Sequence, residues 1–343
     1  MQIVGNDKKS FFVARYGKKG IIEKSKQKKR DNVVMIYNTV LEAIGHTPVI
    51  RLSKMVEPGS AEVLVKYEGV NIGGSIKTRT AYNMICEAQK RGIINKDSIL
   101  VEPTSGNQGI GLALAGAVLG YAVRIIMPDS VSEERRKLIK AYGAELILIH
   151  DAGDIGACID ECLETALRMQ KEDPRVWVPQ QFENPDNPLV HKYHTALEIL
   201  EQVGKPIHGF CSGVGTGGTL SGIGETLKAQ YPDIHIWAVE PENAAILSGG
   251  SIGTHLQMGI GDGLIPKNLN TEIYEKIDIV TDEEALETSR RLAREEGILC
   301  GISSGTNVTA ALRLAKELGE GKTVITVLPD TGERYFSTEL FEN

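Results

Sequence analysis

The sequence predicts an open α/β fold of two domains with mostly parallel sheets. From about residue 34 onward, short runs of β-branched and apolar residues alternate with segments of helical periodicity. Several of these runs are almost wholly apolar, as expected of strands buried on both faces of a parallel sheet. The chain of 343 residues is also long enough for two packed domains.

Seven short runs, most of them rich in Val, Ile or Leu, lie between turn residues and are predicted to be strands. They are residues 98–102, 123–127, 145–150, 176–179, 209–212, 235–239 and 323–328. Among the intervening helices, Ser130 to Glu133 has the spacing of a capping box, which predicts a helix to about Tyr142. Asp282 is the predicted cap of another helix, with Gly297 as its stop.

A cluster of Pro and Asn at residues 183–188 is the predicted domain break. It separates an N-terminal α/β domain (35–183) from a C-terminal one (184–343). Residues 1–34 are a basic extension: ten Lys/Arg against three Asp/Glu in residues 1–31 give +7, so the other 312 residues carry −14. The extension is predicted to be solvated. Contact with nucleic acid or an acidic partner, or a start at Met35, are alternatives.

Composition excludes several classes of protein. No apolar run has the length of a membrane span, and the N-terminus lacks the apolar core of a signal peptide. The acidic body argues against nucleic acid as the main partner. The five cysteines are scattered and suit neither a metal site nor an obvious disulfide, so they are predicted to be reduced thiols in a cytoplasmic protein.

Residues 71–79 (NIGGSIKTR) predict a glycine-rich loop that enters a helix, which Ser75 can cap. Lys77 then lies at a helix N-terminus, where the partial positive charge disfavours an ammonium group. A lysine in that place is shifted towards its neutral amine, which can form a Schiff base with an aldehyde. A surface lysine in the first turn of an ordinary helix is the competing interpretation.

Two glycine-rich turns follow predicted strands, where open α/β sheets bind ligands. The first, residues 104–109 (TSGNQG), leaves backbone N–H groups free for an anion. The second, residues 213–219 (GVGTGGT), forms an anion cradle suited to a phosphate. Its glycines also satisfy the GxGxxG pattern of an NAD(P)-dependent oxidoreductase, with Glu240 as the ribose-binding acid. Such a site would begin in mid-chain and leave the lysine loop and the first turn unexplained.

Three further motifs are residues 296–305 (EGILCGISSG), 328–335 (LPDTGERY) and 179–188 (PQQFENPDNP). Together and in this order, the motifs resemble those of the fold-type II pyridoxal-phosphate (PLP) enzymes, the cysteine synthase and cystathionine β-synthase family. The resemblance covers about residues 37–338. It implies a tryptophan synthase β-like fold with the cofactor in the cleft between the domains, an amino-acid substrate and a homodimer.

The resemblance also implies roles for individual residues. Lys77 would hold PLP as an internal aldimine, and its freed amine would remove the Cα proton. Asn107 would bond the 3′-oxygen of PLP, and Ser303 its pyridine nitrogen, although Ser303 also suits a helix N-cap. The phosphate would lie on Gly215, Thr216, Gly217, Gly218 and Thr219. The substrate carboxylate would meet Thr104, Ser105, Gly106, Gln108 and Gln180, with Gln108 replacing the usual threonine.

The family carries out β-elimination and β-replacement on β-substituted L-alanines through an aminoacrylate, and departures from its pattern indicate which one. Ile72 and Thr78 replace a proline and an aspartate. Asp262 stands in the loop expected over the cofactor, where synthases usually have alanine and cystathionine synthases tyrosine. A carboxylate there can act as a general base on water and would repel hydrosulfide.

Our hypothesis is that the enzyme takes L-cysteine, releases hydrogen sulfide and adds water, giving L-serine, or another nucleophile. Under the alternative, Asp262 only hydrogen-bonds its own loop. Rival activities are cysteine synthesis from O-acetylserine and sulfide, and condensation of serine with homocysteine. A catalytically silent relative that binds partners is a rival of another class.

Overall fold

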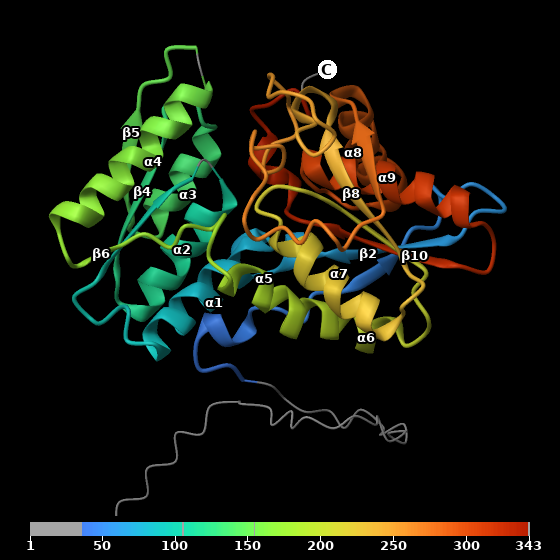
Figure 1. The fold of residues 1–343 in the computed structure, drawn as a ribbon, viewed down its shortest axis with the longest axis horizontal. Coiled ribbons are helices and arrows are strands. Elements are labelled where there is room, and N and C mark those ends of the chain that lie inside the picture. The colour runs from blue at the N-terminus through green and yellow to red at the C-terminus, as the bar shows by residue number, and fades with distance from the viewer. Residues whose placement is uncertain (1–35, 105, 154, 342–343) are drawn as a thin grey trace, which may run out of the picture. The chain divides into compact units, whose positions relative to one another are not determined.

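The computed structural model describes residues 36–104, 106–153 and 155–341 (Figure 1). By their contacts, the described residues from 38 to 341 form one compact unit. The basic extension (1–34) lies outside the described residues, and the interpretations offered for it stay predictions. No helix in the described part of the chain is long and apolar enough to cross a membrane.

The larger of the two sheets has six strands, all parallel except for the β1–β2 pair. Its order is β1 (Val49–Arg51), β2 (Glu62–Tyr67), β10 (Thr323–Leu328), β7 (Gly209–Gly213), β8 (His235–Pro241) and β9 (Lys276–Val280). The smaller sheet is wholly parallel, in the order β5 (Glu145–Ile149), β4 (Ala122–Pro128), β3 (Ile99–Pro103) and β6 (Val176–Trp177). The predicted α/β class with mostly parallel sheets is confirmed.

Helices connect the strands in both sheets (Figure 1). The α-helices are α1 (Lys77–Lys90), α2 (Asn107–Leu119), α3 (Glu133–Ala141), α4 (Ile155–Glu172), α5 (Asp186–Val190), α6 (Ala196–Val203), α7 (Gly218–Gln230), α8 (Asp282–Glu296) and α9 (Ile302–Leu318). A π-helical turn, His191–Thr195, joins α5 to α6. Short 3₁₀ turns are Val40–Ala43, Glu68–Val70, Ile72–Gly74, Glu242–Ala244 and Gly332–Tyr335. Apolar clusters fill the space on both faces of the larger sheet and around the smaller one.

All seven predicted strands are present, with ends shifted by at most two residues. The sequence missed β1, β2 and β9. β1 and β9 are edge strands, and β1 has only three residues. β2 is central, but Lys66 interrupts its apolar run. The ammonium of Lys66 is fully buried, where it donates to the Thr47 carbonyl at 2.6 Å and to Glu198 at 2.7 Å.

The helix caps differ from two predictions. The capping box from Ser130 to Glu133 is wrong, because α3 begins at Glu133 after Ser132, with no side-chain cap bond. The Ser130 hydroxyl instead donates to Asp151 at 2.7 Å. For α8 the cap is Thr281, one residue before Asp282, and it forms a capping box with Glu284. Gly297 ends that helix in the left-handed conformation, as predicted.

The two sheets do not divide the chain into consecutive halves. Strands β1 and β2 pair with each other and, through β10, with the C-terminal strands. The first part of the predicted domain 35–183 therefore lies in the sheet of residues 209–328. The chain forms the smaller sheet only between β3 and β6. Sequence order alone does not show which sheet a strand joins, and the domain boundaries stay a prediction.

Candidate active site

The predicted site segments meet at the carboxyl ends of parallel strands. The turn at residues 104–109 follows β3, and the turn at 213–219 follows β7. The loop after β10 lies against the lysine loop, because Ile76 N–H donates to the Pro329 carbonyl at 2.8 Å and Thr331 N–H to that of Gly74 at 3.2 Å. The first of these strands belongs to the smaller sheet and the other two to the larger one. Open α/β sheets bind ligands at the carboxyl ends of their strands.

Lys77 is the first residue of α1. Ile76 occupies the N-cap position, but the hydroxyl of Ser75 accepts the N–H of Lys77 at 3.3 Å, so Ser75 still satisfies one group at the helix start. Burial lowers the pKa of Lys77 from its usual value of 10.5, against the opposing charges of Asp262 and Asp330. This shift is towards the neutral amine that Schiff-base formation requires.

The turn at residues 215–219 is built for close backbone approach to an anion. α7 begins at Gly218, so its first N–H groups have no intrahelical acceptor. A Cβ at Gly215 would collide with the Gly259 carbonyl, and one at Gly218 with the side chain of Asn187. Gly217 has a φ of 77°, which glycine adopts without strain. We call residues 215–219 the phosphate loop, because these features fit a phosphate group.

Asn187 supports this loop and was missed by the sequence analysis. Its amide is buried and donates to the Thr216 hydroxyl at 2.9 Å and to the Gln181 carbonyl at 2.8 Å. It therefore ties the phosphate loop to the segment that carries Gln180. The signal for Asn187 in the sequence is the motif PQQFENPDNP, which predicts a turn cluster and, through Gln180, a contact with the substrate carboxylate.

The turn at residues 104–109 brings together some of the predicted substrate contacts. Thr104 Oγ1 accepts the N–H of Gly106 at 3.4 Å, and Gly106 precedes α2. Ser105 lies outside the described residues. The Gln108 side chain is 1% exposed and accepts from the Thr80 hydroxyl of α1 at 2.8 Å. Its Nε2 has no partner among the described residues, so the predicted carboxylate contact of Gln108 stays open.

Asn107 is the first residue of α2, and both the nitrogen and the oxygen of its side-chain amide form hydrogen bonds. Its Nδ2 donates to Asp330 Oδ2 at 2.6 Å, and its Oδ1 accepts from Arg334. Tyr335 also donates to Asp330 Oδ2, at 2.8 Å, and Arg334 donates to the Gly73 carbonyl. The motif at 328–335 therefore fixes which way the Asn107 amide points, a role that the sequence did not assign to it.

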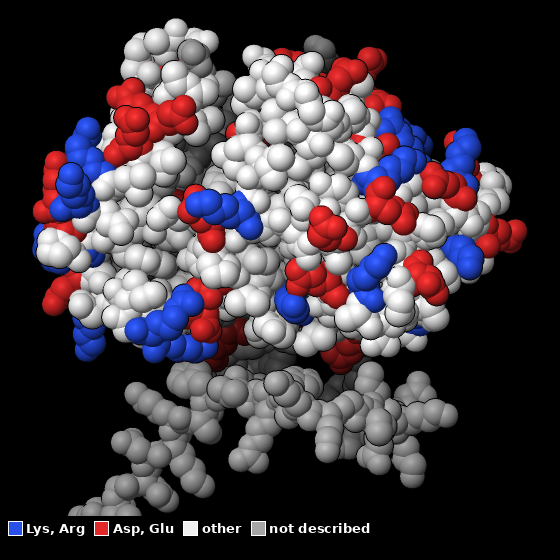
Figure 2. Space-filling view, viewed as in Figure 1, with Lys and Arg blue, Asp and Glu red and all other residues white. Residues whose placement is uncertain are grey.

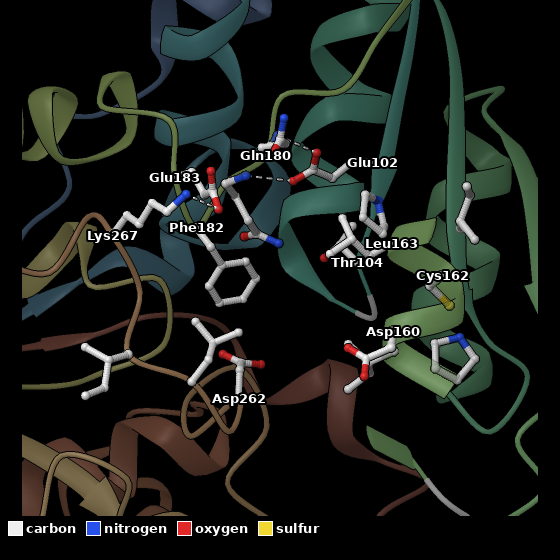
Figure 3. Close-up of a pocket in the computed structure, with 17 residues that line it drawn as sticks. Glu102, Thr104, Asp160, Cys162, Leu163, Gln180, Phe182, Glu183, Asp262 and Lys267 are labelled. Atoms are coloured by element: carbon white, nitrogen blue, oxygen red, sulfur yellow. Dashed lines mark hydrogen bonds and ion pairs between the residues drawn. The ribbon is translucent and has the colours of Figure 1, made fainter. Parts of the chain in front are cut away.

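Gln180 lies in the left-handed region, with a φ of 55°, and lines a cavity of about 280 Å³ together with Thr104 and Asp262. Figure 3 shows how Glu102 at the end of β3 holds this turn. The Glu102 carboxylate accepts the N–H of Gln180 at 3.0 Å and that of Gln181 at 3.1 Å. Burial raises the pKa of Glu102 to about 7, although these two hydrogen bonds lower it.

Because the folded pKa of Glu102 lies above its unfolded value of 4.5, this group lowers stability progressively as the pH rises from about 5 to 7. We expect Glu102→Gln to reduce the fall in unfolding free energy between pH 5 and pH 8 by up to about 3 kcal/mol, measured by urea denaturation. Glu164→Gln, at an exposed position of α4, is the control and should leave that fall unchanged. An equal fall in the free energy of unfolding in both variants would contradict the raised pKa assigned to Glu102.

Asp262 lies in the loop at residues 257–266, beside the phosphate loop. A Cβ at Gly215 would be 3.4 Å from Asp262 Oδ2. Burial raises the pKa of Asp262 above 3.8, against the opposing charges of Lys77 and His255. Within the described residues, the Asp262 carboxylate makes no hydrogen bond to its own loop, so the alternative based on such a bond gains no support.

Ser303 is the second residue of α9 and is 4% exposed. The N-cap position belongs to Gly301, so the interpretation of Ser303 as the cap is wrong. Its predicted contact with a pyridine nitrogen stays a prediction.

The dinucleotide alternative requires Glu240 to be available for a ribose. Its carboxylate instead accepts the N–H of Leu247 at 2.6 Å and that of Ser248 at 3.1 Å. It is therefore occupied within the protein, which disfavours an NAD(P) site. In the described part of the chain, no group of three His, Cys, Asp or Glu is placed to hold a metal ion. All five cysteines are free thiols.

Acidic and basic side chains are interspersed on the face shown in Figure 2, with no broad basic surface among the residues described there.

Comparison with known proteins gives one consistent result. Residues 40–330 match the model of the family described as pyridoxal-phosphate dependent enzymes. A cysteine synthase from Staphylococcus aureus (strain N315) is 51% identical over 316 residues, covering 92% of this chain and 98% of that protein. A probable cysteine synthase from Bacillus subtilis (strain 168) is 44% identical over 310 residues, covering 90% of this chain and 98% of that protein.

Two solved structures are similar over most of the chain. A hydrogen sulfide-producing enzyme from Fusobacterium nucleatum has a TM-score of 0.82 at 40% identity, covering 88% of this chain and 100% of that one. O-ureido-L-serine synthase, as a K43A mutant with O-ureido-L-serine bound, has a TM-score of 0.85 at 39% identity, covering 90% of this chain and 94% of that one.

Proposed function

The chain belongs to the pyridoxal-phosphate-dependent enzymes of the cysteine synthase family, and we propose that its substrate is L-cysteine. In this proposal the enzyme releases hydrogen sulfide and adds water at Cβ, giving L-serine, or adds another nucleophile. β-Replacement and β-elimination are the chemistry of its relatives. The choice of cysteine and of water rests on Asp262.

The residues of the site fit the cofactor. The phosphate loop would hold its phosphate, Lys77 its aldehyde carbon, Asn107 its 3′-oxygen and Ser303 its ring nitrogen. When bound, PLP delocalises the negative charge that develops at the substrate Cα. The fit is supported by the glycine positions that exclude a Cβ and by the Asn107 amide, whose direction Asp330 and Arg334 fix.

Within such a site, the protein residues orient the substrate and move protons. The turn at residues 104–109, together with Gln180, would hold the substrate carboxylate at the start of α2, where the helix favours an anion. Lys77, with its lowered pKa, would take the Cα proton as a neutral amine. The hydrosulfide then leaves Cβ with the electron pair of the C–S bond.

The position of Asp262 is the observation that carries the proposal. Its carboxyl group lines the cavity, interacts with the charge of Lys77 and has a pKa raised by burial. A carboxyl group with a raised pKa exchanges protons more readily near neutral pH. It can take a proton from the water that attacks Cβ. In its charged form it also repels hydrosulfide, which opposes the reverse reaction, cysteine synthesis.

We expect Asp262→Ala to lower the rate of serine formation from cysteine by about 100-fold, the usual contribution of a general base. The measurement is serine by mass spectrometry and sulfide by a colorimetric assay in the same samples. Asp262→Asn keeps the size of the side chain and should show a similar loss. An unchanged yield of serine in both variants would refute the role of Asp262.

Cysteine synthase is the second candidate activity, because a relative at 51% identity has that name. Product analysis distinguishes the two. Cysteine, O-acetylserine and serine are offered separately, each with and without sulfide. Faster formation of cysteine from O-acetylserine and sulfide than of serine from cysteine would favour the synthase.

A further inference from the structure

Asp262 makes no hydrogen bond among the described residues, so its position depends on the backbone that leads to it. The residue before it, Gly261, is held at both of its peptide groups. Its N–H donates to the Val214 carbonyl at 3.0 Å, and its carbonyl accepts from Nε2 of His255 at 3.1 Å. Gly261 is therefore the fixed point from which the Asp262 side chain extends.

The imidazole of His255 bridges two backbone positions of this loop. Its Nδ1 accepts the N–H of Gln257 at 3.2 Å, so the ring proton lies on Nε2, which donates to the Gly261 carbonyl. Gly261 has a φ of 69°, and a Cβ there would be only 3.0 Å from His255 Nε2. A glycine at this position therefore leaves the ring room to reach the carbonyl.

The Gln257 end of this bridge is anchored in the larger sheet and its helices. The Gln257 side chain is fully buried, and its oxygen accepts from the Thr306 hydroxyl of α9 at 2.8 Å. Its nitrogen donates to the Val280 carbonyl of β9 and to Asp282 of α8, both at 2.9 Å. These bonds fix the backbone position to which His255 is bonded.

The loop also packs against the phosphate loop, since a Cβ at Gly215 would collide with the Gly259 carbonyl. Further along the chain, Asp262 lines the cavity shown in Figure 3. Ile159 and Leu163 of α4 line the same cavity. A shift of the loop backbone would therefore move the Asp262 carboxyl group relative to both the phosphate loop and the cavity.

From these bonds we infer that His255 is a positioning residue, whose imidazole links Gln257 to Gly261 and thereby holds Asp262 at the cavity. The inference rests on the proposed role of Asp262 and names the group that orients it. His255 itself transfers no proton, because the backbone occupies both of its ring nitrogens. Misplacing a reacting group by about 1 Å is enough to slow a reaction strongly, so the bond to Gly261 matters for the rate.

The first test measures the loop itself, in the purified enzyme loaded with PLP. Exchange of the Gly261 amide hydrogen is followed by mass spectrometry of peptides that cover residues 256–266. His255→Leu removes both hydrogen bonds of the ring. The exchange should then become about fivefold faster, which is the effect of losing one ordinary hydrogen bond.

Two further variants show which of the two bonds matters. The side-chain nitrogen of Gln reaches about as far as Nε2 of a histidine, and the oxygen of Asn about as far as Nδ1. His255→Gln should therefore keep the bond to Gly261 and the exchange rate of the unaltered enzyme. His255→Asn keeps only the bond to Gln257 and should exchange as fast as His255→Leu. Unchanged exchange in His255→Leu, or recovery in His255→Asn but not in His255→Gln, would overturn the inference.

The second test connects the loop to the reaction. His255→Leu should lower kcat for serine formation from L-cysteine by about tenfold and change KM for cysteine by less than about twofold, because His255 is not among the predicted substrate contacts. In the Asp262→Ala background the same substitution should cause no further loss, since the group that it positions is gone. A further loss of about tenfold in that background would show that His255 acts apart from Asp262.

His235→Leu is the matched control. His235 is the first residue of β8, and its side chain is 45% exposed beside Glu275, with Nδ1 and the carboxylate 2.6 Å apart. This variant should keep both the Gly261 exchange rate and kcat. Losses equal to those of His255→Leu would show a general effect of removing a histidine and would contradict the assigned role.

The two measurements separate this inference from the proposed function. If Asp262→Ala leaves serine formation unchanged, the proposed role of Asp262 fails, and the exchange of Gly261 still decides whether His255 holds the loop. If Asp262→Ala lowers serine formation but His255→Leu changes neither exchange nor kcat, the proposed function stands and the role of His255 fails.

Discussion

Replacement of Lys77 with alanine is expected to lower the turnover of any β-substituted L-alanine by at least about 10⁴-fold, because the variant loses both the covalent attachment of the cofactor and the base for the Cα proton. Both roles belong to the proposed function, and they are supported by the position of Lys77 at the first residue of α1 and by its pKa, which burial lowers. The measurements are initial rates and the intact mass of the protein after borohydride reduction in the presence of PLP. The unaltered chain should gain the mass of the reduced cofactor, and the variant should not.

Lys90→Ala is the matched control for this prediction. Lys90 is the last residue of the same helix, and its side chain is 66% exposed in an ion pair with Glu87. This variant should keep both the turnover and the borohydride adduct. Retention of the adduct in the Lys77 variant would place the covalent attachment on another lysine, and the assignment of the site would be wrong.

The second large effect is expected from Arg79, two residues after Lys77 in α1. The Arg79 guanidinium bonds Glu68 at 2.9 Å and Glu198 at 2.7 Å, and the side chains of Arg79 and Glu68 are 2% and 0% exposed. Removing one partner of a buried ion pair leaves an uncompensated charge, which costs about 3–5 kcal/mol. We therefore expect Arg79→Met to lower the free energy of unfolding by about that amount, measured by urea denaturation at neutral pH.

The contribution of Glu198 to the stability of this ionic cluster depends on pH. Burial raises the pKa of Glu198, but the hydrogen bonds and charges of Arg79 and Lys66 outweigh it and hold the pKa at about 2. Since this lies below the unfolded value of 4.5, the stabilisation is complete above about pH 5 and is lost as the pH falls towards 2. The destabilisation caused by Arg79→Met should therefore be smaller in acid than at neutral pH.

Arg124→Met is the control for the ionic cluster. Arg124 pairs with Glu145 across two neighbouring strands at 2.7 Å, with side chains 34% and 59% exposed. Surface pairs of this kind contribute at most about 1 kcal/mol. An equal loss of stability in both variants would show that the arginine stems, rather than the buried charges, stabilise the fold.

The strands with continuous apolar runs were predictable, because a strand buried on both faces of a parallel sheet needs apolar residues at nearly every position. The same holds for the phosphate loop, whose glycines are needed wherever backbone must approach backbone or a ligand closely. The strand β2 was not predictable, because its buried Lys66 is satisfied by Thr47, Glu198 and Gln202, which are 19 to 136 residues away in the chain.

The sequence by itself determined the family and the cofactor, through the resemblance of its motifs to those of known enzymes. It also determined the segments that carry Lys77, the phosphate loop and the turn at 104–109, since these segments depend on local backbone geometry and residue type. Only the tertiary structure decided which hydrogen bonds hold those segments in place. Asn187 bonds Thr216, and Glu102 bonds Gln180. Asp330 and Arg334 both bond Asn107. It also showed the apolar cavity between α4 and the loop of Asp262. Each of these arrangements joins residues far apart in the chain, and such pairings arise from packing rather than from any local pattern.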